Sequence, residues 1–320
     1  MDPTRRNNRI AAVIAVLYLV AAASGIWLIF TNKPVISARE KTPDQGITLK
    51  PRDTIAVVRV AGPIRISQRP GKFLAYDAEG VARDLREFGK KSDVKAVLIR
   101  INSPGGSVAA VQEIYSEIMK LRENGKVVVA SMGDVAASGG YYIAAACDRI
   151  VANPGTLTGS IGVILEVANV QELFRKIGVK METIKTGRFK DSGSPYRDLT
   201  EEERESFQAL INDAYKQFLT DIMKGRKMEL QKLKKLANGR IFTGSQALDA
   251  GLIDKLGSEE DALELAKKLA GITGKPRIIR DGEPWDRLIS FFGEQTARSP
   301  LGGFTDVVSN MRIRMEYMLE

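Results

Sequence analysis

The chain has 320 residues, 44% of them hydrophobic, and a formal net charge of +9. This apolar content excludes a disordered chain and is sufficient for one large domain or two modest ones. There is no histidine and only one cysteine, Cys147, which excludes a Ser-His-Asp triad, an internal disulfide and a Cys/His metal site. We therefore expect no metal and no cofactor, and Cys147 is predicted to be a core residue. The basic residues are spread along the chain, so we expect no nucleic-acid partner.

The beginning of the chain predicts a membrane anchor. Residues 10–30 form an unbroken apolar run of the length that crosses the hydrocarbon core of a bilayer. Three arginines precede the run and Lys33 alone follows it closely, so residues 1–9 are expected in the cytoplasm and the rest of the chain outside. The alternative is a signal peptide cleaved after its alanines, but the run stays apolar through Phe30, which favours an uncleaved anchor.

Beyond the run, residues 31–53 are polar and contain proline and glycine, which is typical of a stalk. Strands and helices are then predicted to alternate. The expected strands are 55–60, 97–101, 127–132, 149–152 and 179–185, and the expected helices are 81–88, 108–121, 141–147, 170–177, a long one opened by a capping box at Thr200 and Glu203, and 259–269. This succession predicts an α/β fold with helices packed on a sheet.

Ser138 is the first candidate for chemistry, because it lies between a predicted strand and a predicted helix in Gly-Asp-Val-Ala-Ala-Ser-Gly-Gly, residues 133–140. This position presents its hydroxyl at a helix N-terminus, where backbone amides carry partial positive charge. The Gly139 amide is suitably placed to donate to the oxyanion of a tetrahedral intermediate. The alternative is an ordinary N-cap, which is the commoner reason for a serine before a helix.

Lys190 is the best-placed base for Ser138 in a chain without histidine, although a carboxylate or an external group is also open. A lysine acts as a base only when it is neutral, which requires burial or neighbouring positive charge. Phe189 can supply apolar cover and Arg188 a neighbouring positive charge. Asp191 favours the charged form of the lysine if it points inward. The alternative is a solvated surface lysine.

Two further turns carry candidate groups. The turn at 103–107, with Gly105 and Gly106, joins a predicted strand to a predicted helix and leaves its amides free of side-chain cover. Together with the serine turn it can supply both halves of an oxyanion hole, although a plain turn that needs a positive φ is the alternative. Ser160, in the turn at 158–162, offers a hydroxyl that can orient an amine, or is a plain loop serine. Neither glycine-rich turn has the form of a phosphate-binding loop.

Five motifs, taken in chain order, carry a family resemblance. They are the turn at 102–106, the serine motif at 133–140, Thr-Gly-Ser-Ile-Gly-Val at 158–163, a lysine 52 residues after the serine, and Gly-Arg-Ile-Phe-Thr-Gly at 239–244 with Ala247 and Gly-Leu-Ile-Asp at 251–254. In order and spacing they resemble the signal peptide peptidase A family from about residue 53 to 270. The single N-terminal anchor is similar to the short, one-domain form of that family.

The resemblance implies a Clp-protease/crotonase-like fold of stacked ββα units at 54–270, and serine peptidase activity on signal-peptide remnants left after export. By position it implies Ser138 as nucleophile, Lys190 as general base, Ser160 as the hydroxyl that orients the lysine, and the amides of Gly139 and of Gly105 or Gly106, with Gly105 preferred, as oxyanion donors. It also implies a ring- or dome-shaped homo-oligomer in which the serine and the lysine come from neighbouring subunits. Residues 271–320 form a C-terminal extension outside the resemblance, with no assigned role.

Other functions fit parts of this pattern. The dyad does not fix the substrate, so a Ser/Lys peptidase that acts on another membrane protein or on a small peptide stays open. A crotonase-type enzyme acting on acyl-CoA thioesters shares the fold, but the expected location outside the membrane and the Ser/Lys spacing argue against it. A non-catalytic membrane scaffold is a further alternative, and the presence of both Ser138 and Lys190 argues against it.

Overall fold

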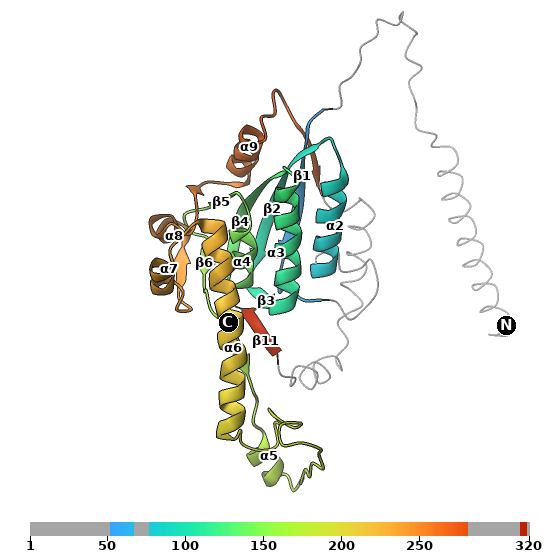
Figure 1. Ribbon diagram of the computed structural model, residues 1–320, viewed down its shortest axis with the longest axis vertical. Coiled ribbons are helices and arrows are strands. Elements are labelled where there is room, and N and C mark those ends of the chain that lie inside the picture. The colour runs from blue at the N-terminus through green and yellow to red at the C-terminus, as the bar shows by residue number, and fades with distance from the viewer. Residues whose placement is uncertain (1–51, 67–76, 281–313, 319–320) are drawn as a thin grey trace, which may run out of the picture. The chain divides into compact units, whose positions relative to one another are not determined.

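The computed structural model describes residues 52–66, 77–280 and 314–318 (Figure 1). The predicted anchor at 10–30 and almost all of the predicted stalk lie outside these residues. Within the described ranges, no helix combines the length and the apolar character needed to cross a bilayer.

A mixed β-sheet forms the core, with its strands in the order β10-β1-β2-β4-β5-β9. Neighbours along this path are parallel; β6 extends the sheet parallel to β4, and β8 pairs antiparallel with β6. The strands are β1 (Thr54–Ala61), β2 (Val94–Ser103), β4 (Val127–Ala137), β5 (Arg149–Ala152), β6 (Leu157–Gly159), β8 (Ile241–Thr243), β9 (Lys255–Leu256) and β10 (Arg277–Arg280). The longest, β1, β2 and β4, are largely buried and rich in β-branched residues, as is typical of a parallel sheet covered on both faces.

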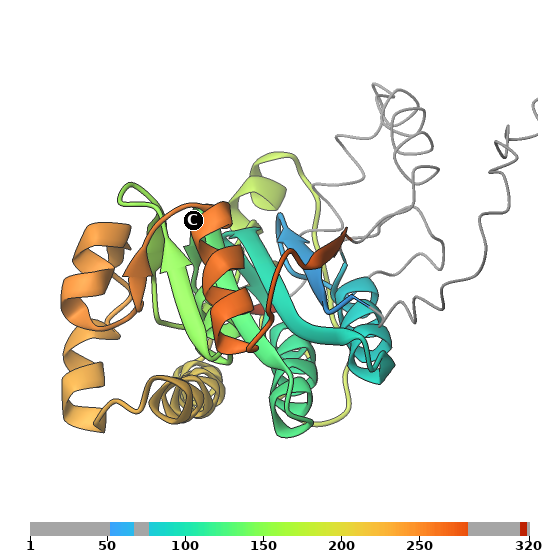
Figure 2. The same ribbon diagram turned by 90° about the horizontal axis from the view of Figure 1, so that it is seen from above.

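Helices cover both faces of this sheet (Figure 2). On one face lie α2 (Ala78–Lys90), α3 (Val108–Glu123), α4 (Gly139–Ala145) and the end of α6 (Glu201–Arg226), and on the other lies α9 (Glu259–Leu269). Alternation along β1 accounts for this, because Val58 belongs to the larger core with α2 and α3, whereas Val57 shares a smaller core with Ala262 and Ala266 of α9. Two short helices complete this part: α7 (Leu230–Leu236) packs against α6, and α8 (Gly244–Ala250) against β6 and β8.

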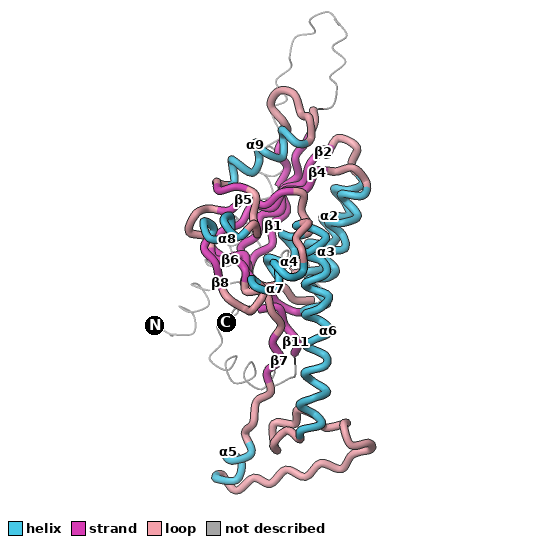
Figure 3. Tube along the Cα trace, turned by 60° about the vertical axis from the view of Figure 1, so that its left-hand side comes forward, coloured by secondary structure: helices cyan, strands magenta, loops and turns pink. Residues whose placement is uncertain are grey.

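The two halves of α6 have different surroundings. A capping box stabilises the start of α6. The Thr200 hydroxyl accepts a hydrogen bond from the Glu203 amide, and the Glu203 carboxylate accepts one from the Thr200 amide. The second half packs on α4, where the rings of Phe218 and Tyr142 stack with centroids 4.6 Å apart. The first half is mostly exposed and extends from the sheet toward the segment around α5 (Gln171–Lys176) (Figures 1 and 3). The residues just before α6 are therefore held away from the main sheet.

A second sheet is formed by β3 (Gly105–Ser107), β11 (Arg314–Met318) and β7 (Ile164–Glu166). β11 is its middle strand and is antiparallel to both neighbours. The C-terminal extension at 271–320, which had no assigned role, thus contributes β10 to the main sheet and β11 to the small one.

Most of the predicted elements are present, among them the helices at 108–121 and 259–269, and Cys147 is buried as expected. The predicted strand at 179–185 is wrong, because these residues have no regular secondary structure. Their apolar side chains, such as that of Ile184, are exposed, and no described strand pairs with them. β-branched residues predict a strand only where a neighbour exists to complete the ladder.

Candidate active site

The ends of three parallel strands meet at one place. Ser103 near the end of β2 pairs with Ala136 in β4, and Ala137 pairs with Gly159 at the end of β6. Ligands of open parallel sheets bind at this carboxyl edge. The turns that follow carry Gly105 and Gly106, Ser138 and Gly139, and Ser160. The structure therefore brings together every predicted site residue except the lysine.

Ser138 has a backbone conformation that is rare for a residue with a side chain. Its φ is 52° and its ψ is −113°, and such left-handed positions cost roughly 1–3 kcal/mol outside glycine. The residue occupies the N-cap position of α4, but its hydroxyl makes no capping hydrogen bond. An ordinary N-cap therefore does not account for this serine. Its amide donates to the Gly159 carbonyl at 2.7 Å, which fixes it beside β6.

Buried hydroxyls and close backbone contacts hold the serine turn. Thr158 Oγ1 donates to the Ala136 carbonyl at 2.6 Å, and Thr156 Oγ1 donates to the Gly133 carbonyl at 2.7 Å. A Cβ at Gly140 would lie 2.9 Å from the Ser103 carbonyl oxygen, so packing requires glycine there. The sequence gives no sign of the two threonines' role, because a threonine near a turn is compatible with many contacts.

Ser160 is supported from behind by β8. Its φ is 47°, and its amide donates to the Arg240 carbonyl at 2.8 Å. The preceding residue, Gly159, lies so close to Phe242 that a Cβ there would be 2.5 Å from the ring. The motif at 239–244, which contributed to the resemblance, thus forms the backing of the turn that carries Ser160.

In the turn after β2, the amide of Gly105 is bonded within the turn and the amide of Gly106 faces β11. The Gly105 amide donates to the Ser103 hydroxyl at 3.1 Å. The backbone of Ile64 bonds to the Gly105 carbonyl at 2.8 Å and to the Ser107 amide at 2.9 Å. Because successive peptide groups of a strand point in opposite directions, the Gly106 amide faces away from Ile64 and toward β11. A Cβ at Gly106 would lie 2.0 Å from the Ile64 carbonyl oxygen, so glycine is required there.

β11 lies alongside this turn. Tyr317 is opposite Gly106, and Met318 is opposite Gly105. The strand also lies close to α4, which begins directly after Ser138. An extended segment of the chain's own C-terminal part therefore runs between β3 and β7 in the neighbourhood of the candidate nucleophile.

Lys190 is separated from these turns within one chain. It is exposed, and its loop is attached to the start of α6, where the Ser192 hydroxyl donates to Glu203 at 3.1 Å. Helix α4 packs on the other half of α6, at Phe218. At 1.5 Å per residue, positions 203 and 218 are about 22 Å apart along the helix axis. Among the described residues, no hydrogen bond or ion pair joins the Lys190 side chain to Ser138 or Ser160.

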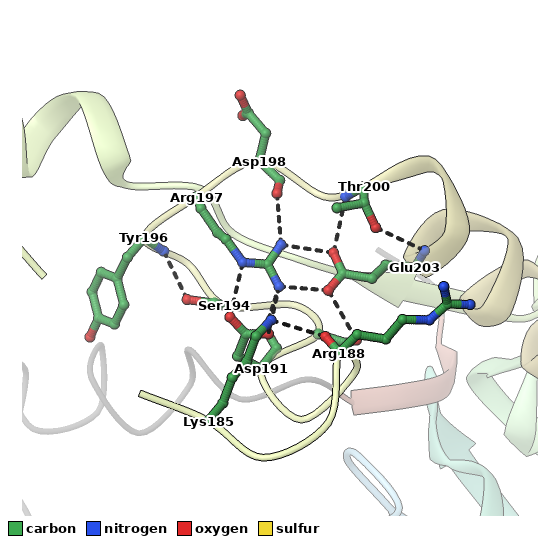
Figure 4. Close-up of polar contacts among 10 residues, drawn as sticks. Lys185, Arg188, Asp191, Ser194, Tyr196, Arg197, Asp198, Thr200 and Glu203 are labelled. Atoms are coloured by element: carbon green, nitrogen blue, oxygen red, sulfur yellow. Dashed lines mark hydrogen bonds and ion pairs between the residues drawn. The ribbon is translucent and has the colours of Figure 1, made fainter. Parts of the chain in front are cut away.

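An ion-pair cluster fastens the Lys190 loop to α6 (Figure 4). The Arg197 guanidinium donates to both carboxylate oxygens of Asp191 and to both of Glu203, at 2.6–3.0 Å. Lys185 also pairs with Asp191. The hydrogen bonds from Arg197 are the main reason that the pKa of Asp191 lies far below its ordinary value and that of Glu203 at about 2. Sequence periodicity gives no sign of this cluster, since most of its members lie on an irregular loop.

Comparison with known proteins agrees with this architecture. The model of peptidase family S49 matches residues 120–273, and the Clp protease model matches residues 72–156. A putative protease of Synechocystis sp. is 46% identical over 221 residues, which cover 69% of this chain and 76% of that protein. A putative signal peptide peptidase SppA of Enterococcus faecium is 39% identical over 276 residues, which cover 86% of this chain and 79% of that protein. The chain belongs to peptidase family S49.

Membership of family S49 indicates a serine protease, and the Clp protease match agrees with the mixed α/β sheet. The predicted family and the Clp-protease-like fold are thereby confirmed. A chloroplastic serine protease SPPA of Arabidopsis thaliana is 41% identical over 226 residues, which cover 69% of this chain but 33% of that protein. The roles of the individual site residues stay predictions.

Proposed function

We propose that this chain is a membrane-anchored serine endopeptidase that degrades remnant signal peptides with a dyad of Ser138 and Lys190. The observation that carries the proposal is the uncapped, left-handed Ser138 at the carboxyl edge of the sheet. A strained serine between a strand and a helix is typical of a nucleophile. Family S49 supports a serine protease, and the name of the Enterococcus faecium relative supports signal peptides as the substrate class.

The base for Ser138 comes from a neighbouring copy. Lys190 lies on the order of 20 Å along α6 from the place where α4 packs, and its side chain is exposed. Large apolar side chains in the segment before Lys190 are exposed as well, and a second copy would cover them. They are Leu173, Ile177, Val179, Met181, Ile184 and Phe189. A head-to-tail arrangement of copies closes into a ring in which each interface holds one serine and one lysine.

The reaction is an acyl transfer to Ser138. The neutral amine of Lys190, oriented by the Ser160 hydroxyl, accepts the Ser138 proton while the hydroxyl oxygen attacks the peptide carbonyl. Lys190 then protonates the leaving amine. A water molecule repeats these steps on the acyl-serine and releases the acyl group.

Two backbone amides stabilise the oxyanion that forms in each step. One is the Gly139 amide, at the start of α4. For the other we favour Gly106 over Gly105, because the Gly105 amide already donates to Ser103 and the Gly106 amide faces the strand position occupied by β11.

The substrate is held as an added β-strand. An extended peptide in the place of β11 would pair with β3 on one side and with β7 on the other. Main-chain hydrogen bonds hold such a peptide with little dependence on its side chains. This mode of binding suits an enzyme that degrades peptides of varied sequence.

The anchor at 10–30 and the stalk at 31–53 would hold the peptidase domain at the outer surface of the membrane, where hydrophobic remnants stay after export. Alkaline carbonate extraction of membranes tests this placement. The full chain should stay in the membrane fraction, whereas a chain that begins at residue 34 should be released. A mature protein shorter by about 23 residues would contradict an uncleaved anchor.

Cleavage of a synthetic signal peptide by the full chain in detergent tests the function itself. We expect cleavage by the unaltered protein and none by Ser138→Ala or Lys190→Met, while both variants keep the oligomeric state. Near-normal activity of Lys190→Met would show that the base is another group. An assembled but inert unaltered protein would favour the non-catalytic scaffold.

A further inference from the structure

The cluster around Arg197 is formed by residues that have no assigned part in the predicted dyad. Besides its bonds to Asp191 and Glu203, Arg197 donates to the Asp198 carbonyl at 3.0 Å. The side chains of Asp191 and Glu203 are only 12% and 2% exposed. Exposed ion pairs contribute little to stability, but a guanidinium fork on largely buried carboxylates imposes one geometry on the groups it joins. The loop before α6 is therefore held in a defined position.

The cluster is also balanced in charge. Its two carboxylates face two cations, Arg197 and Lys185. Asp191 follows Lys190 in the sequence, and an uncompensated carboxylate there would favour the charged form of the lysine, which cannot act as a base. Two further ion pairs lie at this end of α6, Arg188 with Glu202 at 3.0 Å and Arg204 with Glu201 at 3.7 Å.

We propose that Arg197 is a positioning residue for Lys190. It fixes the Lys190 loop to α6 through Asp191 and Glu203, and it compensates the charge of Asp191. The lysine amine thereby reaches the neighbouring copy from a defined place, without an uncompensated carboxylate beside it that would favour its charged form. This inference rests on the proposed function, because it takes Lys190 as the general base.

The pH dependence of kcat/KM for a signal peptide, measured with the full chain in detergent, tests the charge role. Arg197→Gln leaves the cluster with a net negative charge, so the acidic limb of the profile should move to higher pH by about 0.5–1 unit. Glu203→Gln leaves a net positive charge and should move the limb the other way. Both variants weaken the attachment of the loop, so kcat should fall in both while KM changes little. A merely structural role would not produce shifts of opposite sign.

Two further variants serve as controls. Arg175→Gln removes an exposed ion pair of the same segment, with Glu172 at 2.7 Å, and should keep the unaltered profile. Arg197→Lys keeps the charge but loses the fork, so kcat should fall without a shift of the limb. If Arg197→Gln does not assemble, Asp191→Asn takes its place, and its limb should move to lower pH as in Glu203→Gln.

Lys190→Met, measured in the same assay, separates this inference from the proposed function. If Lys190→Met is inactive and the charge variants leave the acidic limb in place, the positioning role is wrong and the dyad stands. If Lys190→Met keeps near-normal activity, the assignment of the base is wrong, and the positioning role falls with it.

Discussion

At the scale of single residues, the site depends on backbone contacts that leave no space for a side chain. Helix α6 approaches α4 at Gly225, where an added Cβ would lie 1.8 Å from the Ala145 carbonyl oxygen. Gly106 and Gly140 are similarly close to the carbonyl oxygens of Ile64 and Ser103. Packing of the chain on itself thus explains these glycines without reference to the substrate.

In the substitution Gly225→Ala, helix propensity and packing have opposite effects on stability. Alanine is favoured over glycine inside a helix by about 1 kcal/mol, but the contact with Ala145 forces α4 and α6 apart, and such overpacking costs roughly 1–3 kcal/mol. We expect the free energy of unfolding in urea to decrease. Gly155→Ala is the matched control, because nothing lies within 4 Å of a Cβ there. A more stable Gly225→Ala protein would contradict the close approach of the two helices.

The lowered pKa of Glu203 predicts that the stability of the fold depends on pH. This pKa is lowered from 4.5 to about 2, chiefly by the hydrogen bonds from Arg197. The unfolded chain therefore binds this proton more readily, so Glu203 stabilises the fold above about pH 4.5, and this contribution is lost as the pH falls toward 2. Urea unfolding at about pH 6 and about pH 3 should show a smaller loss of stability in Glu203→Gln than in the unaltered protein. Equal losses would contradict the role of this carboxylate.

At the scale of elements, helices and strands that depend on local sequence could be predicted, whereas the pairing of strands that are distant in the sequence could not. The helix at 259–269 follows from its apolar periodicity and from the N-cap at Ser258. Both signals are contained within this short segment. The segment 314–318 alternates between polar and apolar residues over only a few positions, from Arg314 to Tyr317, and it is a strand because β3 and β7 offer it two edges. The same reasoning explains the opposite error at 179–185, where the strand-forming residues have no described partner.

The candidate site shows the same division. Ser138, Gly139 and Ser160 could be named from their turns, whose glycine and serine content is visible in the sequence. Their proximity depends on the parallel pairing of β2, β4 and β6, which the sequence does not encode in any one segment. The contacts of Arg197 likewise join positions whose spacing follows no period.

Removal of β11 tests whether this strand stands where the substrate binds. A chain that ends after Ile313 leaves the edges of β3 and β7 free, so the KM for an extended peptide should fall. A fluorophosphonate should also label Ser138 faster, since this residue is only 1% exposed with β11 in place. A chain that ends after Met318 keeps β11 and is the control. Loss of activity without β11, in a protein that still assembles, would show that the strand belongs to the active fold.

At the scale of the whole molecule, one chain carries all the proposed catalytic groups but does not bring them together. The serine turn lies at the carboxyl edge of the main sheet, and the loop that carries Lys190 is attached to the start of α6. The exposed apolar side chains from Leu173 to Phe189 lie in the segment that would meet a second copy. Activity is therefore expected of the assembly and not of the single chain.

Mixing two inactive variants tests this central claim most directly. Ser138→Ala and Lys190→Met are dissociated, combined in equal amounts and reassembled, and cleavage of a signal peptide is measured. If the serine and the lysine come from neighbouring copies, activity returns to about one quarter of the unaltered level, because about one interface in four then holds both intact residues. Mixed oligomers that form but stay inactive would contradict a site shared between copies.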